Sequence, residues 1–128
     1  MDVMKTHGAV SWSELMTTDP AGAKQFYSKL FGWSMKDMSM PDGTYTTAQV
    51  GETSVVGIMS VPPQAAGMPP SWGTYVTVTD VDATLLEVVR LRGKVLMPPI
   101  DVPGVGRMAV IQDPQGAALS IITYSMPS

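Results

Sequence analysis

Residues 11–33 read SWSELMTTDPAGAKQFYSKLFGW, and this stretch decides the fold predicted for the 128-residue chain. The side chains of residues 11–17 alternate well enough to predict a half-buried strand. This alternation predicts that one face of the strand carries Trp12, Glu14 and Met16. What this face contacts is the central question for function, because it combines a carboxylate with large apolar side chains.

A helix is predicted after this strand, and residues with a clear physical role mark its two ends. Asp19 is a good N-cap because its carboxylate can accept from free amides of the first turn, and Pro20 suits the first helical position. Gly32 fits the left-handed residue that ends a helix. The cap and the glycine stop recur 61 residues later at Asp80 and Gly93, which indicates an internal duplication.

Two strand–helix–three-strand modules account for nearly the whole chain. The first is predicted over residues 9–61 and the second over residues 72–125. Between them, residues 62–71 are too rich in Pro, Gly and Ala for regular structure and are predicted to be a linker. At this length the two modules are expected to form a single domain, residues 1–128.

Two further segments are expected to interrupt the regular structure. Residues 1–8 are predicted to form a loose arm that contains the only histidine, His7. In the second module, a short strand over residues 94–97 is expected to end at Pro98 and Pro99, because proline cannot donate to a strand ladder.

Composition excludes several classes of function. The net charge is −3 and the eight Lys and Arg residues are scattered, so the chain lacks the basic patch of a nucleic-acid-binding protein. The absence of cysteine excludes disulfides and thiolate metal sites, and no apolar run is long enough to span a membrane. A cytoplasmic location is the expectation. Eleven methionines suit an adaptable pocket for an apolar ligand, although core packing and compositional bias explain them as well.

Three motifs together resemble the vicinal oxygen chelate superfamily, which holds glyoxalase I, extradiol dioxygenases, fosfomycin-resistance enzymes and bleomycin-binding proteins. The motifs are TTDPAGAKQFYSKLFGW, VTVTDVDATLLEVVRLRG and DPQGAALSII. The opening stretch is most similar to a glyoxalase-like branch of that group. The resemblance implies an α+β fold of two βαβββ modules, whose curled mixed sheets form a cup, and it implies a homodimer.

The resemblance also implies where a metal would be bound. Its metal-dependent members carry ligands at the positions occupied in this chain by Trp12, Gly57, Gly73 and Ser120. None of these four side chains is an imidazole or a carboxylate, whereas a divalent site needs at least three such donors. No metal or other cofactor is therefore predicted.

Glu14 is the strongest chemical candidate in the chain. A carboxylate that is desolvated in an apolar cup suits a general base. Alternatively, Glu14 could pair with Arg107 or a tyrosine hydroxyl and only orient a ligand. The predicted ligand-binding residues are Trp12, Glu14, Met16, Tyr75 and Ser120.

These residues leave more than one function open. The first is a metal-independent binding protein of the glyoxalase/bleomycin-resistance type, which buries an apolar or aromatic small molecule in a cup at a dimer interface. The second is a glyoxalase-like lyase or isomerase, or a dioxygenase, which acts either without metal through Glu14 or with atypical metal ligands. The third is an interaction module whose dimer serves only as a scaffold.

Overall fold

The computed structural model describes residues 1–40, 43–61 and 67–125, and the chain divides into two compact units. The first unit is Trp12–Gly73, and the second combines Met1–Ser11 with Thr74–Ser128. The α+β class and the repeated βαβββ order are confirmed. Half of the predicted linker, residues 62–66, lies outside the described residues. No helix in the described ranges is both long enough and apolar enough to cross a membrane.

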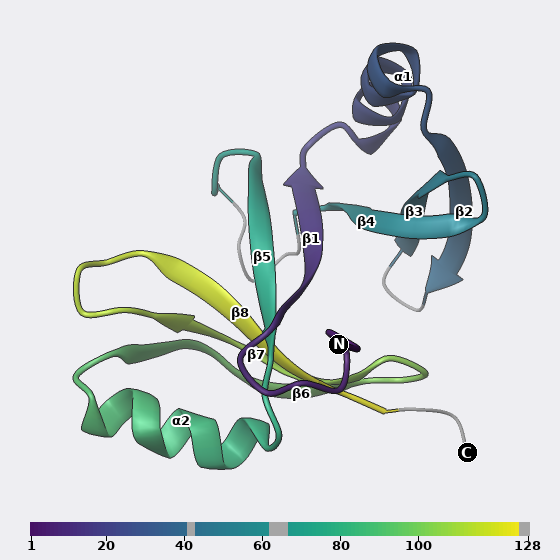
Figure 1. Cartoon of the computed structure of the whole chain (residues 1–128). Coiled ribbons are helices and arrows are strands. Elements are labelled where there is room, and N and C mark those ends of the chain that lie inside the picture. Colours follow the sequence, from purple (N-terminus) through teal and green to yellow (C-terminus); the bar gives the residue numbers. More distant parts are fainter. Residues whose placement is uncertain (41–42, 62–66, 126–128) are drawn as a thin grey trace. The chain divides into compact units, whose positions relative to one another are not determined.

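The first unit is built on four strands in the order β2-β3-β4-β1 (Figure 1). β1 runs parallel to β4, whereas β2, β3 and β4 form an antiparallel meander. Helix α1 follows β1 and contacts β2 and β4. The bounds of the elements are β1 Val10–Thr17, α1 Pro20–Phe31, β2 Ser34–Met40, β3 Gly43–Val50 and β4 Thr53–Ser60.

Helix α1 begins and ends where the sequence predicts. The Asp19 side chain accepts from the amide of Gly22 at 3.0 Å, and Pro20 occupies the first helical position. At the other end Gly32 adopts a left-handed conformation, with φ of 73°, and its amide donates to the carbonyl of Ser28. Local hydrogen bonds therefore set both ends of this helix.

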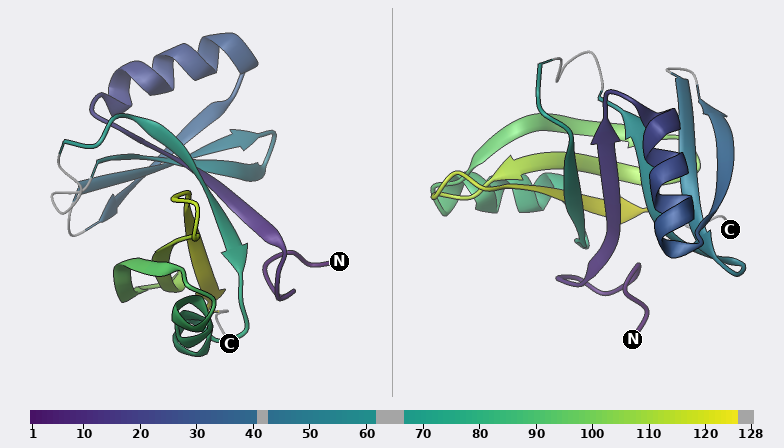
Figure 2. Two further views of the ribbon diagram at one scale, coloured as in Figure 1. Left: turned by 90° about the vertical axis from the view of Figure 1, so that its left-hand side faces the viewer. Right: turned by 90° about the horizontal axis from the view of Figure 1, so that it is seen from above.

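The second unit repeats the arrangement with the strand order β5-β8-β7-β6, and β5 runs parallel to β8. Figure 2 shows its helix, α2, against these strands from two further directions. Its core joins α2 to β7 and β8 through Val78, Val81, Leu85, Ala109 and Ile121. The bounds of the elements are β5 Ser71–Thr77, α2 Val81–Arg90, β6 Lys94–Val102, β7 Gly106–Gln112 and β8 Ala118–Tyr124.

The end of α2 differs from the prediction that Gly93 is the stop. The left-handed residue is Arg92, with φ of 70°, and the amides of Arg92 and Gly93 donate to the carbonyls of Val89 and Val88. Glycine is instead required at position 93 because there is no room for a side chain. A β carbon there would lie 2.8 Å from the carbonyl oxygen of Gln112.

The strand expected to end at Pro98 continues through both prolines, so this expectation is wrong. β6 runs from Lys94 to Val102, and its pairing with β7 shifts register on either side of Met97. β6 lies at the end of the strand order, and Pro98 and Pro99 fall in the shift between the paired residues Met97 and Ile100, so their missing amide donors cost the ladder no hydrogen bond.

The first residues are also more ordered than expected. The amide of Gly8 donates to the Thr77 carbonyl at 2.7 Å, and the Thr77 amide donates to Ala9 at 2.9 Å. The amide of Thr79 donates to His7 Nδ1 at 3.0 Å. The arm is therefore fixed to the end of β5 rather than loose.

Candidate functional site

A chain of hydrogen bonds leads to the buried carboxylate of Glu14. Only 5% of Glu14 is exposed, and its Oε2 accepts from the hydroxyl of Tyr45 at 2.7 Å. The same Tyr45 oxygen accepts from Trp12 Nε1 at 3.0 Å. We call these three residues the Trp12–Tyr45–Glu14 relay. The Tyr45 hydroxyl thereby supplies the kind of hydrogen-bond donor that a buried carboxylate needs.

Strand geometry explains why these side chains meet. Trp12 and Glu14 are two residues apart in β1 and therefore point to the same face. Glu14 is paired with Gly57 of β4, which is paired in turn with Thr47 of β3. Tyr45 is two residues from Thr47, so its side chain shares this face. The opposite face carries the buried side chains of Leu15, Thr46, Ala48 and Ile58.

Gly57 makes room for the relay. Its φ is not in the left-handed region, so its lack of a side chain is not needed for backbone conformation. A β carbon built on Gly57 would overlap the hydroxyl and ring of Tyr45, and it would lie 3.1 Å from Trp12 Nε1. The phenol of Tyr45 therefore fills the space that any larger residue at position 57 would need.

Methionines lie beside the relay on the same face. Met16 of β1 is paired with Met59 of β4, and Met38 of β2 is paired with Tyr45. Met16 and Met59 are half-buried, and Met38 is 40% exposed. Together with Trp12 and Tyr45, they give this face of the first unit a polarisable, apolar surface around one carboxylate.

The structure places the two remaining predicted site residues together in the second unit. Tyr75 of β5 is paired with Ser120 of β8. Tyr75 is buried and its hydroxyl points to the sulfur of Met108 at 3.7 Å, while Ser120 is half-buried. By strand register, this pair is the counterpart of Glu14 and Gly57 in the first unit.

The donor set does not fit the metal that the fold family implies. The positions corresponding to metal ligands are Trp12, Gly57, Gly73 and Ser120, and the Tyr45 phenol occupies the space at Gly57. Within the described ranges, no three His, Asp or Glu residues come close enough together to hold an ion. Metal independence nevertheless stays a prediction.

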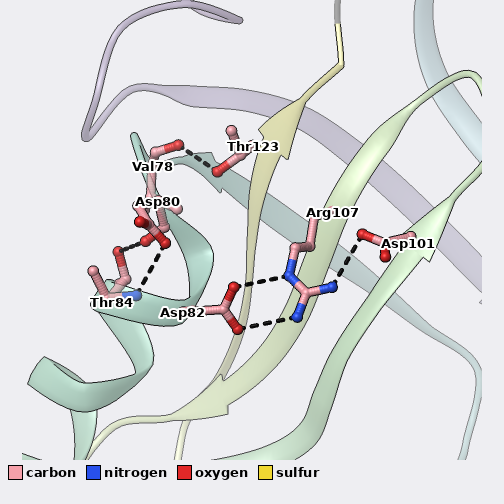
Figure 3. Close-up of polar contacts among 8 residues, drawn as sticks. Val78, Asp80, Asp82, Thr84, Asp101, Arg107 and Thr123 are labelled. Carbon is pink, nitrogen blue, oxygen red and sulfur yellow. Dashed lines mark hydrogen bonds and ion pairs between the residues drawn. The ribbon is translucent and has the colours of Figure 1, made fainter.

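Arg107 donates to carboxylates of the second unit, and the Tyr45 hydroxyl is a partner that the structure gives Glu14. Figure 3 shows the Arg107 guanidinium between Asp82 and Asp101. It donates twice to Asp82, at 3.0 Å each, and once to Asp101 at 3.1 Å. The hydrogen bond from Arg107 holds the pKa of the Asp82 carboxyl below its usual value. These charges tie α2 to β6 and β7.

Tyr45 and the spatial role of Gly57 are the site features that the sequence predictions missed. The sequence identifies Gly57 only as a metal position without a donor. The alternation of β3 does place Tyr45 and Thr47 on one face, but the sequence carries no signal that this face is shared with Glu14.

Comparisons with known proteins agree with this fold. The family model of the Glyoxalase/Bleomycin resistance protein/Dioxygenase superfamily matches residues 9–121. The Mycobacterium tuberculosis protein named "Putative glyoxylase CFP32" is 44% identical over 117 residues, and the match covers 89% of this chain and 45% of that protein. The Streptomyces peucetius "Anthracycline biosynthesis protein DnrV" is 36% identical over 127 residues, covering 89% of this chain and 46% of that protein. The chain thus spans about half the length of these curated relatives.

A solved structure supports the same fold at lower identity. A variant of Streptomyces coelicolor methylmalonyl-CoA epimerase, in complex with 2-nitronate-propionyl-CoA, superposes with a TM-score of 0.67. The match covers 94% of this chain and 100% of that chain, at 13% identity, and so is evidence for the fold alone. With the family model matching most of its length, the chain belongs to the glyoxalase/bleomycin resistance protein/dioxygenase superfamily.

Proposed function

We propose that the chain is a metal-independent small-molecule-binding protein that holds an apolar or aromatic ligand on the Glu14 face of its first unit. The observation that carries this proposal is a carboxylate that is 95% buried on a face of aromatic and methionine side chains. Small-molecule sites combine a mostly apolar lining with a few polar groups that fix orientation. Trp12, Met16 and Tyr45 supply the lining, and Glu14 supplies the polar anchor.

The relatives favour the same class of ligand. One is named for anthracycline biosynthesis, and anthracyclines are flat, polycyclic aromatic compounds. Flat rings pack well on Trp and Tyr side chains, and methionine adapts to ligands of different outline. We propose further that a second copy of the chain completes the cup. In the completed cup, Tyr75 and Ser120 also contact the ligand.

A thermal unfolding experiment tests this proposal. The chain is melted by circular dichroism alone, with an anthracycline and with 2-naphthol. A ligand at 100 times its Kd stabilises a protein by about 2.7 kcal/mol, which raises Tm by roughly 10 °C at this size. Light scattering under the same conditions is expected to give twice the chain mass of 13.6 kDa. If no aromatic ligand shifts Tm, the binding function is wrong; a monomer contradicts only the dimer.

A second candidate is catalysis, and the burial of Glu14 is the observation that favours it. In a desolvated site a carboxylate can take a proton from carbon next to a carbonyl group, as in an isomerase or lyase. The relatives named as a glyoxylase and the dioxygenases of the superfamily make these the reaction classes to assay, including routes with atypical metal ligands. Glu14→Gln is expected to abolish turnover while leaving aromatic binding measurable. Stoichiometric metal in the purified protein would favour the metal-dependent version.

A further inference from the structure

The N-terminal arm forms one wall of a pocket in the second unit, and none of the residues proposed for the Glu14 face lines this pocket. Its volume is about 260 Å³, and it is lined by Met4, Lys5 and His7, together with residues 77–79 and 123–124 near the ends of β5 and β8. Pockets for drug-sized molecules range upward from about 300 Å³, so this one suits a smaller ligand. No acidic side chain lines it in the described part of the chain, although the net charge of the chain is −3.

Hydrogen bonds hold the walls of this pocket in place. The Thr77 hydroxyl donates to the carbonyl of Val3 at 2.7 Å, and the amide of Gly8 donates to the carbonyl of Thr77. On the other wall, the Thr123 hydroxyl donates to the carbonyl of Val78 at 2.7 Å (Figure 3). The arm is thus anchored on both sides of Lys5 and His7. A ligand that enters walls fixed in this way does not have to order them, which lowers the entropic cost of binding.

His7 contributes a hydrogen-bond donor to the pocket. Its Nδ1 accepts from the backbone amide of Thr79 at 3.0 Å. Because an amide N–H can only donate, Nδ1 carries no proton and the proton of the imidazole is on Nε2. A metal ligand or a proton acceptor needs an unprotonated nitrogen that faces the partner, and the one such nitrogen of His7 is already used. Nε2–H is therefore the group that His7 can offer to a ligand.

Lys5 adds a positive charge to the same wall. None of the ion pairs within the described ranges involves Lys5. The acidic residues closest to the pocket in sequence, Asp2 and Asp80, accept from backbone amides. Lys5 and His7 are both exposed, so a ligand reaches them directly from solvent. The pocket thus combines an ammonium group with an N–H donor.

We propose that this pocket binds a small carboxylate with a short apolar body, and that Lys5 and His7 each donate to one carboxylate oxygen. A carboxylate has two acceptor oxygens and so matches two donors, whereas a phosphate group brings three. Met4 and Val78 provide the apolar contacts for the rest of the molecule. This second ligand site lies in the second unit and is independent of the function proposed for the Glu14 face.

A matched pair of probes tests the proposal. Isovalerate and isovaleramide have the same outline and the same apolar body, but only isovalerate is charged. Proton NMR of an untagged chain follows the imidazole signals, which need no assignment because His7 is the only histidine. Isovalerate is expected to shift these signals with a Kd in the millimolar range. Ion pairs at exposed sites are modest, so isovaleramide should bind about fivefold more weakly.

A pair of lysine variants separates a direct contact from a general effect of charge. In Lys5→Gln the preference for isovalerate should fall from about fivefold to about twofold, with the Thr79 amide resonance unchanged because the arm stays attached. Lys94→Gln removes the same charge from β6 of the same unit, at a residue that does not line the pocket, and should leave the preference unchanged. Nitrogen–proton correlation spectra of the imidazole should place its proton on Nε2.

Each result supports or overturns the proposal. Equal affinity for isovalerate and isovaleramide, or no shift of the His7 signals with either, refutes the carboxylate site. An equal loss of preference in Lys5→Gln and Lys94→Gln refutes the direct contact with Lys5, and a proton on Nδ1 refutes the role of His7. Tighter binding of inorganic phosphate than of isovalerate refutes the assignment to carboxylates. None of these results bears on aromatic binding at the Glu14 face, which is measured with 2-naphthol.

Discussion

Replacing Gly57 by alanine tests whether the relay is as tightly packed as the structure indicates. The new methyl group would overlap the hydroxyl and ring of Tyr45, so either β4 or the tyrosine must move. Overpacking of a filled site costs about 1–3 kcal/mol. Displacing the phenol also removes a hydrogen bond to the charged Glu14, worth about 1.5–3 kcal/mol. Alanine also restricts the backbone of the unfolded chain more than glycine does, and this stabilises the fold by about 0.4–1 kcal/mol and offsets part of the cost. The free energy of unfolding should therefore fall by about 3 kcal/mol.

The assay is urea unfolding followed by circular dichroism, with Gly73→Ala as the matched control. Gly73 is another of the predicted metal positions, and a β carbon there would meet nothing closer than a backbone oxygen at 3.9 Å. Gly73→Ala should therefore change the free energy of unfolding by less than about 0.5 kcal/mol.

A double-mutant cycle isolates the contact between positions 57 and 45. In a Tyr45→Ala background the overlap is gone, so adding Gly57→Ala should cost less than about 1 kcal/mol. If Gly57→Ala costs as much beside Ala at position 45 as beside Tyr, the strain does not come from the phenol. If Gly57→Ala is as stable as the wild-type chain, the packing argument fails altogether.

Two further predictions concern the second unit. Asp80 caps α2 by accepting from the amide of Ala83 at 3.1 Å. Asp80→Ala should therefore lower the free energy of unfolding, measured in urea, by about 1 kcal/mol. Equal stability of the variant and the wild-type chain would contradict the role of Asp80 as a cap. The hydrogen bond from Arg107 lowers the pKa of the Asp82 carboxyl below its ordinary value, so the ion pair stabilises the fold above that value and the contribution is lost as the pH falls through the folded-state pKa. Urea midpoints of the wild type and Arg107→Gln should therefore differ at pH 7 and converge toward pH 2; a gap that widens in acid would contradict this sign.

The ends of α1 were predictable because they depend on neighbours in sequence. Asp19 reaches an amide three residues away, and the amide of Gly32 reaches a carbonyl four residues back. The same reasoning failed at Pro98, because a proline is tolerated or excluded according to whether its strand has a neighbour on that side. That information lies in the strand order and not in the local sequence.

The candidate site could likewise be predicted only where it depends on local sequence. A period of two residues sufficed to place Trp12, Glu14 and Met16 on one face of β1. It could not identify which of the four tyrosines meets Glu14, since this depends on the register of β1 with β4 and of β4 with β3. Long-range pairing of this kind is decided by the fold as a whole, so Tyr45 could be found only in the structure.

The burial of Glu14 bears on whether the chain is only a scaffold. An unpaired carboxylate in a protein interior costs several kcal/mol, and even a well-paired one is often no more stable than an apolar side chain of similar volume. Methionine at position 14 would suffice on a purely structural face, as Met16 does on the same face of β1. The fold instead holds Glu14 with a tyrosine that requires glycine at position 57. Such an arrangement is expected where a carboxylate has a ligand to meet, and the decisive variant replaces both partners of the hydrogen bond. Glu14→Met/Tyr45→Phe should lose binding of 2-naphthol while unfolding at an equal or higher urea concentration, and a marked loss of stability would instead favour a structural role.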